Sequence, residues 1–327
     1  MKRDDVGAVE DRSMVDIEFR SLGLGGPQVS TIGLGCNNFG RTGTATEDQM
    51  GTNALISEAI TLGVTLFDTA DMYGGAPGVS ESLMGVALHG HRDSVFLATK
   101  FGHDGVDMGI APGVPKGSRA YIREALEGSL RRLQTDRVDL YQMHTPDPQT
   151  PIEETIAALD ELVDEGRVIH YGHSNFSAYQ IDAAAAAGRF VSSQNEYSLL
   201  ARNIEADVLP AINRNHLGLL PYFPLQNGLL TGKFTRTEHP VDSRIMRQRP
   251  HIAENAPWDV LEAYAAFCEA REITMLEATF GWLLAQPGLS SVIAGTTRPE
   301  QLRQNAAAST AWKPSSEEIA RVSAIFD

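Results

Sequence analysis

Side chains that can transfer a proton follow three successive apolar runs of the chain. One run ends at Phe67, which Asp68 and then Tyr73 follow, the next leads to Lys100, and the third ends at His144. A phenol with a pKa of about 10 is a poor acid at neutral pH, but a neighbouring ammonium stabilises its phenolate. We therefore expect Tyr73 to act as a general acid whose pKa Lys100 lowers. Asp68 would keep Lys100 charged, and His144 would donate a hydrogen bond to a carbonyl oxygen.

The elements that would position these residues repeat along the chain. A short apolar run, a polar or glycine-containing loop and a helical pattern with apolar residues at three- and four-residue spacing alternate from Thr31 onward. The apolar runs are Ile32–Cys36, Val64–Phe67, Val95–Lys100, Val138–His144, Val168–Gly172, Val191–Asn195, Gly218–Phe223 and Ser291–Ala294. This alternation predicts an α/β fold. Eight parallel strands joined by helical crossovers favour closure of the sheet into a (β/α)8 TIM barrel. In such a barrel the carboxyl ends of the strands hold the active site, so the proton-transfer residues would share one rim.

Other segments complete the predicted barrel. The glycines between Ile17 and Ser30 predict an N-terminal β-hairpin that caps one end. The charged, aperiodic residues 1–16 predict a disordered tail, which leaves 17–327 as a single barrel domain. Two long βα loops, Gly102–Gly117 and Gln226–Pro257, are expected at the C-terminal face, where they would line a substrate pocket or form a lid.

Composition excludes several classes of function. The net charge of -15 is incompatible with the basic surface that a nucleic acid or an anionic membrane requires. No run approaches the roughly 18 apolar residues of a membrane helix. With two distant cysteines and no apolar leader, the chain is expected to be cytoplasmic. The histidine pairs His89/His91 and His170/His173 lack further ligands nearby, so no metal site is expected. The oligomeric state is left open.

The motifs around these residues resemble a known family. The segments Phe67–Gly74 (FDTADMYG), Thr99-Lys100 and Asp139–His144 (DLYQMH) are similar to the catalytic segments of aldo-keto reductases. Further matching segments follow in the expected order: Gly172–Phe176, Gln194–Ser198, Pro224–Lys233 and Ile293–Thr297. The resemblance covers nearly the whole chain after residue 17. It implies the reduction of an aldehyde or ketone to an alcohol by hydride transfer, with Tyr73 as the proton donor.

The resemblance also implies a nicotinamide cofactor at the mouth of the barrel, without a Rossmann domain. NADPH is expected, and NADH is the alternative. Ser174, Asn175 and Gln194 would hold the carboxamide, and Tyr222 would stack on the nicotinamide ring. The residues expected at the pyrophosphate are Leu225, Gly228 and Leu230. Those expected at the adenosine end are Gly295, Thr296, Thr297, Arg298, Gln301 and Asn305.

Some positions differ from the family pattern. Arg298 could bind a 2′-phosphate, but Gly295 and Gln301 stand where many relatives carry a lysine and an arginine for that group. Asn37 stands where one branch of the family has a tryptophan, so stacking of the substrate there is not carried over. The substrate, a small carbonyl compound, is expected to contact Phe39, Phe101 and Thr145.

Two other functions fit the same residues. The four proton-transfer residues would serve an NAD(P)-linked polyol or sugar dehydrogenase that works in the oxidising direction. The chain is also similar to potassium-channel β subunits, which bind a cofactor and regulate a partner, but it shows no channel-binding extension. Phosphate binding by a P-loop is not expected, because the spacing in Gly228–Lys233 is too short and Phe234 replaces the required hydroxyl residue.

Overall fold

The protein folds into a barrel of eight parallel strands. A computed structural model describes residues 16–110, 113–241 and 243–327, so residues 1–15 of the predicted tail lie outside the described part. The order of the strands around the barrel is β10-β3-β4-β5-β6-β7-β8-β9. Their bounds are β3 Ile32–Gly35, β4 Leu66–Asp68, β5 Phe96–Phe101, β6 Val138–Met143, β7 Val168–Ser174, β8 Ser192–Glu196, β9 Gly218–Tyr222 and β10 Val292–Gly295.

The barrel is closed by contacts between its first and last strands. β10 pairs with β3 in parallel register, and β9 packs beside β10. A parallel bridge between Leu219 of β9 and Leu289, just before β10, also joins these two sides. The predicted (β/α)8 barrel is therefore confirmed.

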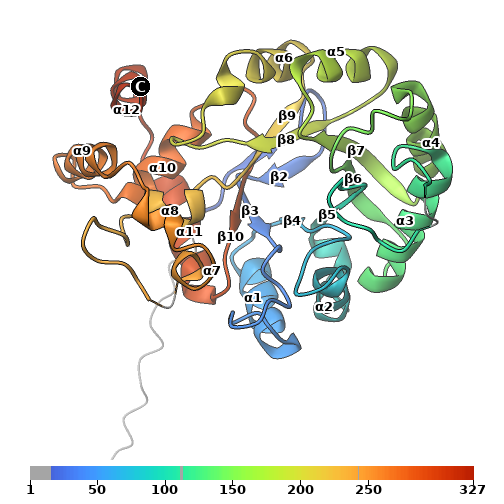
Figure 1. Ribbon diagram of the computed structural model, residues 1–327, viewed down its shortest axis with the longest axis horizontal. Coiled ribbons are helices and arrows are strands. Elements are labelled where there is room, and N and C mark those ends of the chain that lie inside the picture. The colour runs from blue at the N-terminus through green and yellow to red at the C-terminus, as the bar shows by residue number, and fades with distance from the viewer. Residues whose placement is uncertain (1–15, 111–112, 242) are drawn as a thin grey trace, which may run out of the picture.

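Helices surround the strands (Figure 1). Their bounds are α1 Gln49–Thr61, α2 Val79–Ala87, α3 Arg119–Leu133, α4 Ile152–Asp164, α5 Ala178–Ala187, α6 Val208–Arg214, α7 Arg244–Gln248, α8 His251–Glu254, α9 Trp258–Glu269, α10 Met275–Leu284, α11 Pro299–Ala311 and α12 Ser316–Ile325. Side-chain caps set several of their starts. The Ser118 hydroxyl accepts from the backbone N–H of Tyr121, and Ser177 forms a capping box with Gln180. These caps keep the loops before α3 and α5 in fixed positions.

The predicted hairpin is present at the amino end of the barrel. β1 (Phe19–Ser21) and β2 (Gln28–Ser30) pair antiparallel. Leu22 and Val29 are fully buried and belong to a separate apolar cluster. The other buried members, from the barrel strands, are Leu66, Ala98, Leu140, Leu220 and Ile293. The hairpin therefore closes the bottom of the barrel and leaves the opposite end for a ligand.

Alternation along each strand decides which side chains reach the interior. In β5, Ala98 belongs to the interior cluster, and Lys100 lies two residues further on the same face. Leu97 and Phe101 belong instead to the large cluster that the strands share with the helices. The interior face thus changes from apolar at the bottom to charged at the top.

The two long loops differ in structure. The described part of 102–117 holds no helix or strand. The second loop contains a short irregular helix, η3 (Gln226–Thr231), followed by α7 and α8. In the described part of the chain, no helix combines the length and apolar character needed to cross a membrane.

Candidate active site

A cavity of about 720 Å³ opens at the carboxyl ends of the strands. This volume lies within the range of small-molecule sites. Asp68, Tyr73 and His144 line it, and Lys100 lies buried beneath them. The long second loop contributes Ser243 to the wall, and the first loop contributes residue 103. Three of the four predicted proton-transfer residues therefore share one cavity, and the fourth, Lys100, bonds to Asp68 and Tyr73 from below.

An ion pair lies at the base of this site. The Lys100 Nζ is 2.6 Å from the Asp68 Oδ2, and both side chains are buried. The other Asp68 oxygen accepts hydrogen bonds from the amides of Gln142 at 3.2 Å and Gln194 at 3.0 Å. Burial alone would lower the pKa of Lys100, but Asp68 and Tyr73 outweigh it and raise this pKa above its ordinary value. Lys100 is therefore a charged donor, and the Asp68 carboxylate is fully bonded.

Tyr73 lies directly above the ammonium. Its hydroxyl oxygen is 3.3 Å from the Lys100 Nζ, which donates to it. Burial raises the pKa of Tyr73, and the opposing effect of Lys100 does not cancel this rise. The expected net lowering of this pKa is therefore wrong, because desolvation of the partly buried phenol outweighs the effect of Lys100. Tyr73 is protonated at neutral pH and carries a proton that it can donate.

His144 faces the same space. Its ring lies 5.7 Å from the ring of Tyr73 in an edge-to-face arrangement. Burial, with Lys100 nearby, holds the pKa of His144 well below its usual value, so the imidazole is neutral. Its Nδ1 is buried without a partner among the described residues. A neutral imidazole with one N–H can donate a hydrogen bond to a carbonyl oxygen without itself giving up a proton.

The residues expected at the nicotinamide end form a hydrogen-bonded set. The Asn175 amide donates to the main-chain oxygen of His144 and to the Ser174 hydroxyl. The Asn175 Oδ1 accepts from the Tyr222 hydroxyl at 2.9 Å. All three line the cavity, as does Gln194, whose amide nitrogen already bonds to Asp68. These contacts fix each side chain before any ligand arrives.

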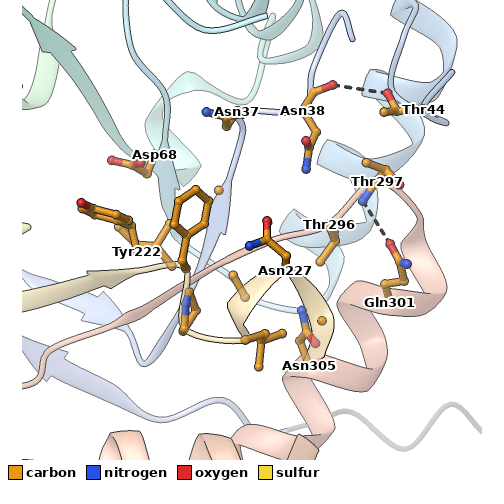
Figure 2. Close-up of a pocket in the computed structure, with 18 of the residues that line it drawn as sticks. Asn37, Asn38, Thr44, Asp68, Tyr222, Asn227, Thr296, Thr297, Gln301 and Asn305 are labelled. Atoms are coloured by element: carbon orange, nitrogen blue, oxygen red, sulfur yellow. Dashed lines mark hydrogen bonds between the residues drawn. The ribbon is translucent and has the colours of Figure 1, made fainter. Parts of the chain in front are cut away.

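The cavity continues toward the amino end of α11. Figure 2 shows Asp68 and Tyr222 at one end and Thr297, Gln301 and Asn305 at the other. The Gln301 side chain accepts from the backbone N–H of Thr297 at 3.2 Å. The remaining predicted residues that line the cavity are Leu225, Gly228, Gly295, Thr296 and Arg298.

Leu230 and the three residues predicted to contact substrate do not line the cavity. Phe101 follows Lys100 on β5, so it points out of the barrel and packs on Tyr141 at 4.6 Å. Phe39 and Leu230 are completely buried in the same large cluster. The Thr145 hydroxyl is occupied by the backbone, because it donates to the Gly102 oxygen and accepts from the Asp104 N–H.

Sequence reasoning missed several residues that line the cavity. They include His103, whose ring lies 4.7 Å from His144, and Lys233 and Arg247 from the second loop. Lys233 ends the glycine-containing segment whose spacing rules out a P-loop. Arg247 lies in the basic segment 244–249, which contains three arginines. The positive charge of this segment is the sequence signal that could have identified Arg247. Nothing in the sequence marks His103, because its approach depends on the path of an irregular loop.

The residues present fit a nicotinamide dinucleotide. The Thr296 Oγ1 and the Asn37 Oδ1 are buried, line the cavity and have no partner within the described residues. Such atoms require a polar ligand or water. Arg247, Arg298 and Lys233 bring positive charge to the wall of the cavity, in a protein whose net charge is negative. A long, elongated ligand with polar and anionic groups matches this lining.

Comparison with known proteins agrees with this geometry. The model of the aldo/keto reductase family matches residues 31–327. Aldo-keto reductase YhdN of Bacillus subtilis is 35% identical over 320 residues, which are 95% of this chain and 94% of that protein. Probable aldo-keto reductase 1 of Glycine max is 34% identical over 87% of this chain and 82% of its own. The solved holo form of aldo-keto reductase AKR11C1 from Bacillus halodurans superimposes with a TM-score of 0.78 at 30% identity, covering 94% of this chain and 96% of that one. The chain therefore belongs to the aldo/keto reductase family.

Proposed function

We propose that this protein reduces a small aldehyde or ketone to the alcohol, with NADPH as the hydride donor and Tyr73 as the proton donor. Its family supports carbonyl reduction with a nicotinamide cofactor in general. The observation that carries the finer proposal is the position of Tyr73. Its hydroxyl lies in the cavity, bonded to a buried ammonium that is itself paired with Asp68.

The cofactor would be held along the cavity by residues already in place. Ser174, Asn175 and Tyr222 would contact its nicotinamide end, and Thr296 and Arg298 its adenosine end. Lys233 and Arg247 would contact its phosphates. When bound, the cofactor supplies the hydride that the carbonyl carbon accepts.

The protein's own residues manage the proton. His144 donates a hydrogen bond to the carbonyl oxygen and so polarises the carbonyl bond. Tyr73 gives its hydroxyl proton to the same oxygen, and Lys100 stabilises the phenolate that remains. Asp68 keeps the ammonium charged and prevents it from losing a proton in place of Tyr73. Because the pKa of Tyr73 lies above its ordinary value, the hydroxyl keeps at neutral pH the proton that reduction requires.

Arg298 and Arg247 are the side chains that support a preference for NADPH. Each lines the cavity and forms no ion pair with a described carboxylate, so each could bind a 2′-phosphate. Gly295 and Gln301 supply no charge there. We therefore expect a moderate preference, which Arg298→Ala would reduce while NADH binding changes little.

Titration of the purified protein with NADPH and with NADH, followed through quenching of tryptophan fluorescence, tests this proposal. A panel of aldehydes and ketones is then added to the bound cofactor. Tighter binding of NADPH, followed by its oxidation, is the expected result. Binding without turnover of any carbonyl would favour a regulatory, cofactor-binding protein, and the absence of binding would contradict the proposal. Turnover that occurs only with alcohols and NADP⁺ would favour the polyol dehydrogenase.

A further inference from the structure

A second histidine, His103, lies beside the proposed proton-transfer residues. Its ring centre is 4.7 Å from that of His144, and the two rings meet edge to face, with an angle of 84° between their planes. The ring of Tyr73 also meets His144 edge to face. All three side chains line the cavity. The wall beside Tyr73 and His144 therefore continues to His103, where the atoms next to a bound carbonyl group would lie.

The turn that carries His103 is held from two sides. The Thr145 hydroxyl, just after β6, donates to the Gly102 main-chain oxygen at 2.9 Å and accepts from the Asp104 N–H at 3.1 Å. From further along the loop, the Lys116 ammonium donates to the main-chain oxygen of His103. The backbone around His103 is thus fixed before a ligand binds, which lowers the entropic cost of recognition.

The contacts of the His103 imidazole decide which of its nitrogens a ligand can use. The backbone N–H of Gly105 donates to the Nδ1 at 3.0 Å, and the Asp104 Oδ1 lies 3.5 Å from the same atom. The Nε2 bonds to no group in the part of the chain that the structure describes. Because the Nδ1 accepts a hydrogen bond, the hydrogen of the neutral ring is on the Nε2. A protonated ring carries a hydrogen there as well, so the Nε2 offers an N–H donor in either state.

We propose that His103 determines substrate specificity by donating a hydrogen bond from its Nε2 to an oxygen on the carbon atom next to the carbonyl group. This inference rests on the proposed function, which places the carbonyl oxygen at Tyr73 and His144. Oxygens on adjacent carbon atoms lie close together, so two rings in direct contact can bind one oxygen each. The favoured substrates are then aldehydes and ketones that carry a hydroxyl group or a second carbonyl group at the adjacent position.

A substrate without that second oxygen leaves the donor of His103 unsatisfied. Such a substrate displaces water from the Nε2 without replacing its hydrogen bond, and this loss reduces the affinity. The side chain of His103 is 32% exposed, so water can still reach part of the ring. We therefore expect a preference of about tenfold, smaller than a completely buried donor would give.

Two matched pairs of substrates measure this preference: propanal with lactaldehyde, and butanone with acetoin. In each pair the second compound adds a hydroxyl group to the carbon next to the carbonyl group. The ratio of the two kcat/KM values with NADPH is compared between protein variants, so the intrinsic reactivity of each compound cancels. His103→Phe keeps an aromatic ring but has no donor, and we expect it to lower the ratio by about tenfold in both pairs.

Two amide variants test where the donor must lie. The amide of His103→Gln can reach the place of the Nε2, whereas the amide of His103→Asn reaches only the place of the Nδ1. We expect His103→Gln to retain most of the preference and His103→Asn to lose it, as His103→Phe does. A misfolded variant would lose turnover of both members of a pair. The ratio, and its rescue in His103→Gln, therefore separate recognition from folding.

Asp104→Asn is the matched control, since it removes the exposed charge near the Nδ1 and leaves the Nε2 in place. Its ratios should equal those of the parent protein. Unchanged ratios in His103→Phe and His103→Asn, or an equal fall in Asp104→Asn, would overturn this inference alone. Failure of the parent to reduce any of the four compounds would also overturn it, and failure on every carbonyl compound of the wider panel would overturn the proposed function as well.

Discussion

At the scale of single residues, the Lys100–Asp68 pair serves both folding and chemistry. Both side chains are buried, and Lys100 also donates to the Thr69 main-chain oxygen at 2.9 Å. Replacing one member of such a pair leaves an uncompensated charge in the interior, whereas removing both charges does not. The two roles of the pair can therefore be separated by substitution.

We predict that Lys100→Met destabilises the protein by about 3 to 5 kcal/mol and abolishes reduction. The double variant Lys100→Met with Asp68→Asn should regain much of the stability, because no unpaired charge remains, but it should regain no activity. Chemical denaturation and steady-state turnover measure the two effects. Activity in the stabilised double variant would show that the ammonium is not needed for proton transfer.

The sequence could identify these residues but not all their surroundings. Asp68, Tyr73, Lys100 and His144 could be predicted, because polar groups at the ends of apolar strands must meet at one rim of a barrel. Phe101 does not face the cavity because adjacent residues of a strand point to opposite faces, and Lys100 already occupies the inner one. The rise in the pKa of Tyr73 depends on burial by loops whose paths the sequence does not determine.

At the scale of elements, the segment η3 connects β9 to the cation Lys233. Gly228 has a φ of +103°, a conformation that side chains rarely adopt. A Cβ at this position would lie 2.5 Å from the Lys233 Cε and 2.7 Å from its Nζ. The glycine thus allows the lysine to lie across the loop at the edge of the cavity.

We predict that Gly228→Ala weakens NADPH binding by at least about tenfold, because it displaces Lys233 and strains the loop. Gly25→Ala provides a matched control. Gly25 also has a positive φ, of 70°, but a Cβ there would meet nothing within 4 Å, and the residue belongs to the hairpin at the other end of the barrel. Fluorescence titration should show normal NADPH affinity in Gly25→Ala. Equal affinities in the two variants would contradict the role given to this loop.

Elements with strong local signals were predictable. Residues 119–133 form α3, whose start can be read from Ser118 as the cap and whose end follows from apolar spacing that continues to Leu133. The hairpin cap and the eight strands were also predicted, with ends that differ by a few residues. The short helices α7 and α8 were not, since each has too few residues to show a periodic pattern. Arg247 reaches the cavity from one of them.

At the scale of the whole molecule, two buried groups make stability depend on pH in opposite directions. His173 is fully buried between Phe176 and Phe190, and burial lowers its pKa from 6.5 to about 3. Its contribution to stability is present above pH 6.5 and is lost as pH falls toward 3. The pKa of Asp71 is raised from 3.8 to about 7, mainly by burial and further by repulsion from the Glu81 carboxylate. Its contribution is present below pH 3.8 and is lost as pH rises through 7.

We predict that His173→Phe makes the loss of stability between neutral pH and about pH 4 smaller by about 3 kcal/mol. Asp71→Asn should stabilise the protein at pH 8, where the parent carries a buried carboxylate, and should have little effect at acid pH. Urea denaturation at a series of pH values measures both changes. Parallel stability curves for the parent and His173→Phe would show that His173 does not remain neutral in the folded protein.

The central claim is that Tyr73 donates the proton during carbonyl reduction, and one comparison tests it most directly. NADPH is bound to the parent protein and to Tyr73→Phe, an aldehyde is added, and oxidation of the bound cofactor is followed through a single turnover. We expect both proteins to bind NADPH with similar affinity, and the variant to lose turnover by a factor of at least about a thousand. Comparable oxidation rates in the two proteins would contradict the claim.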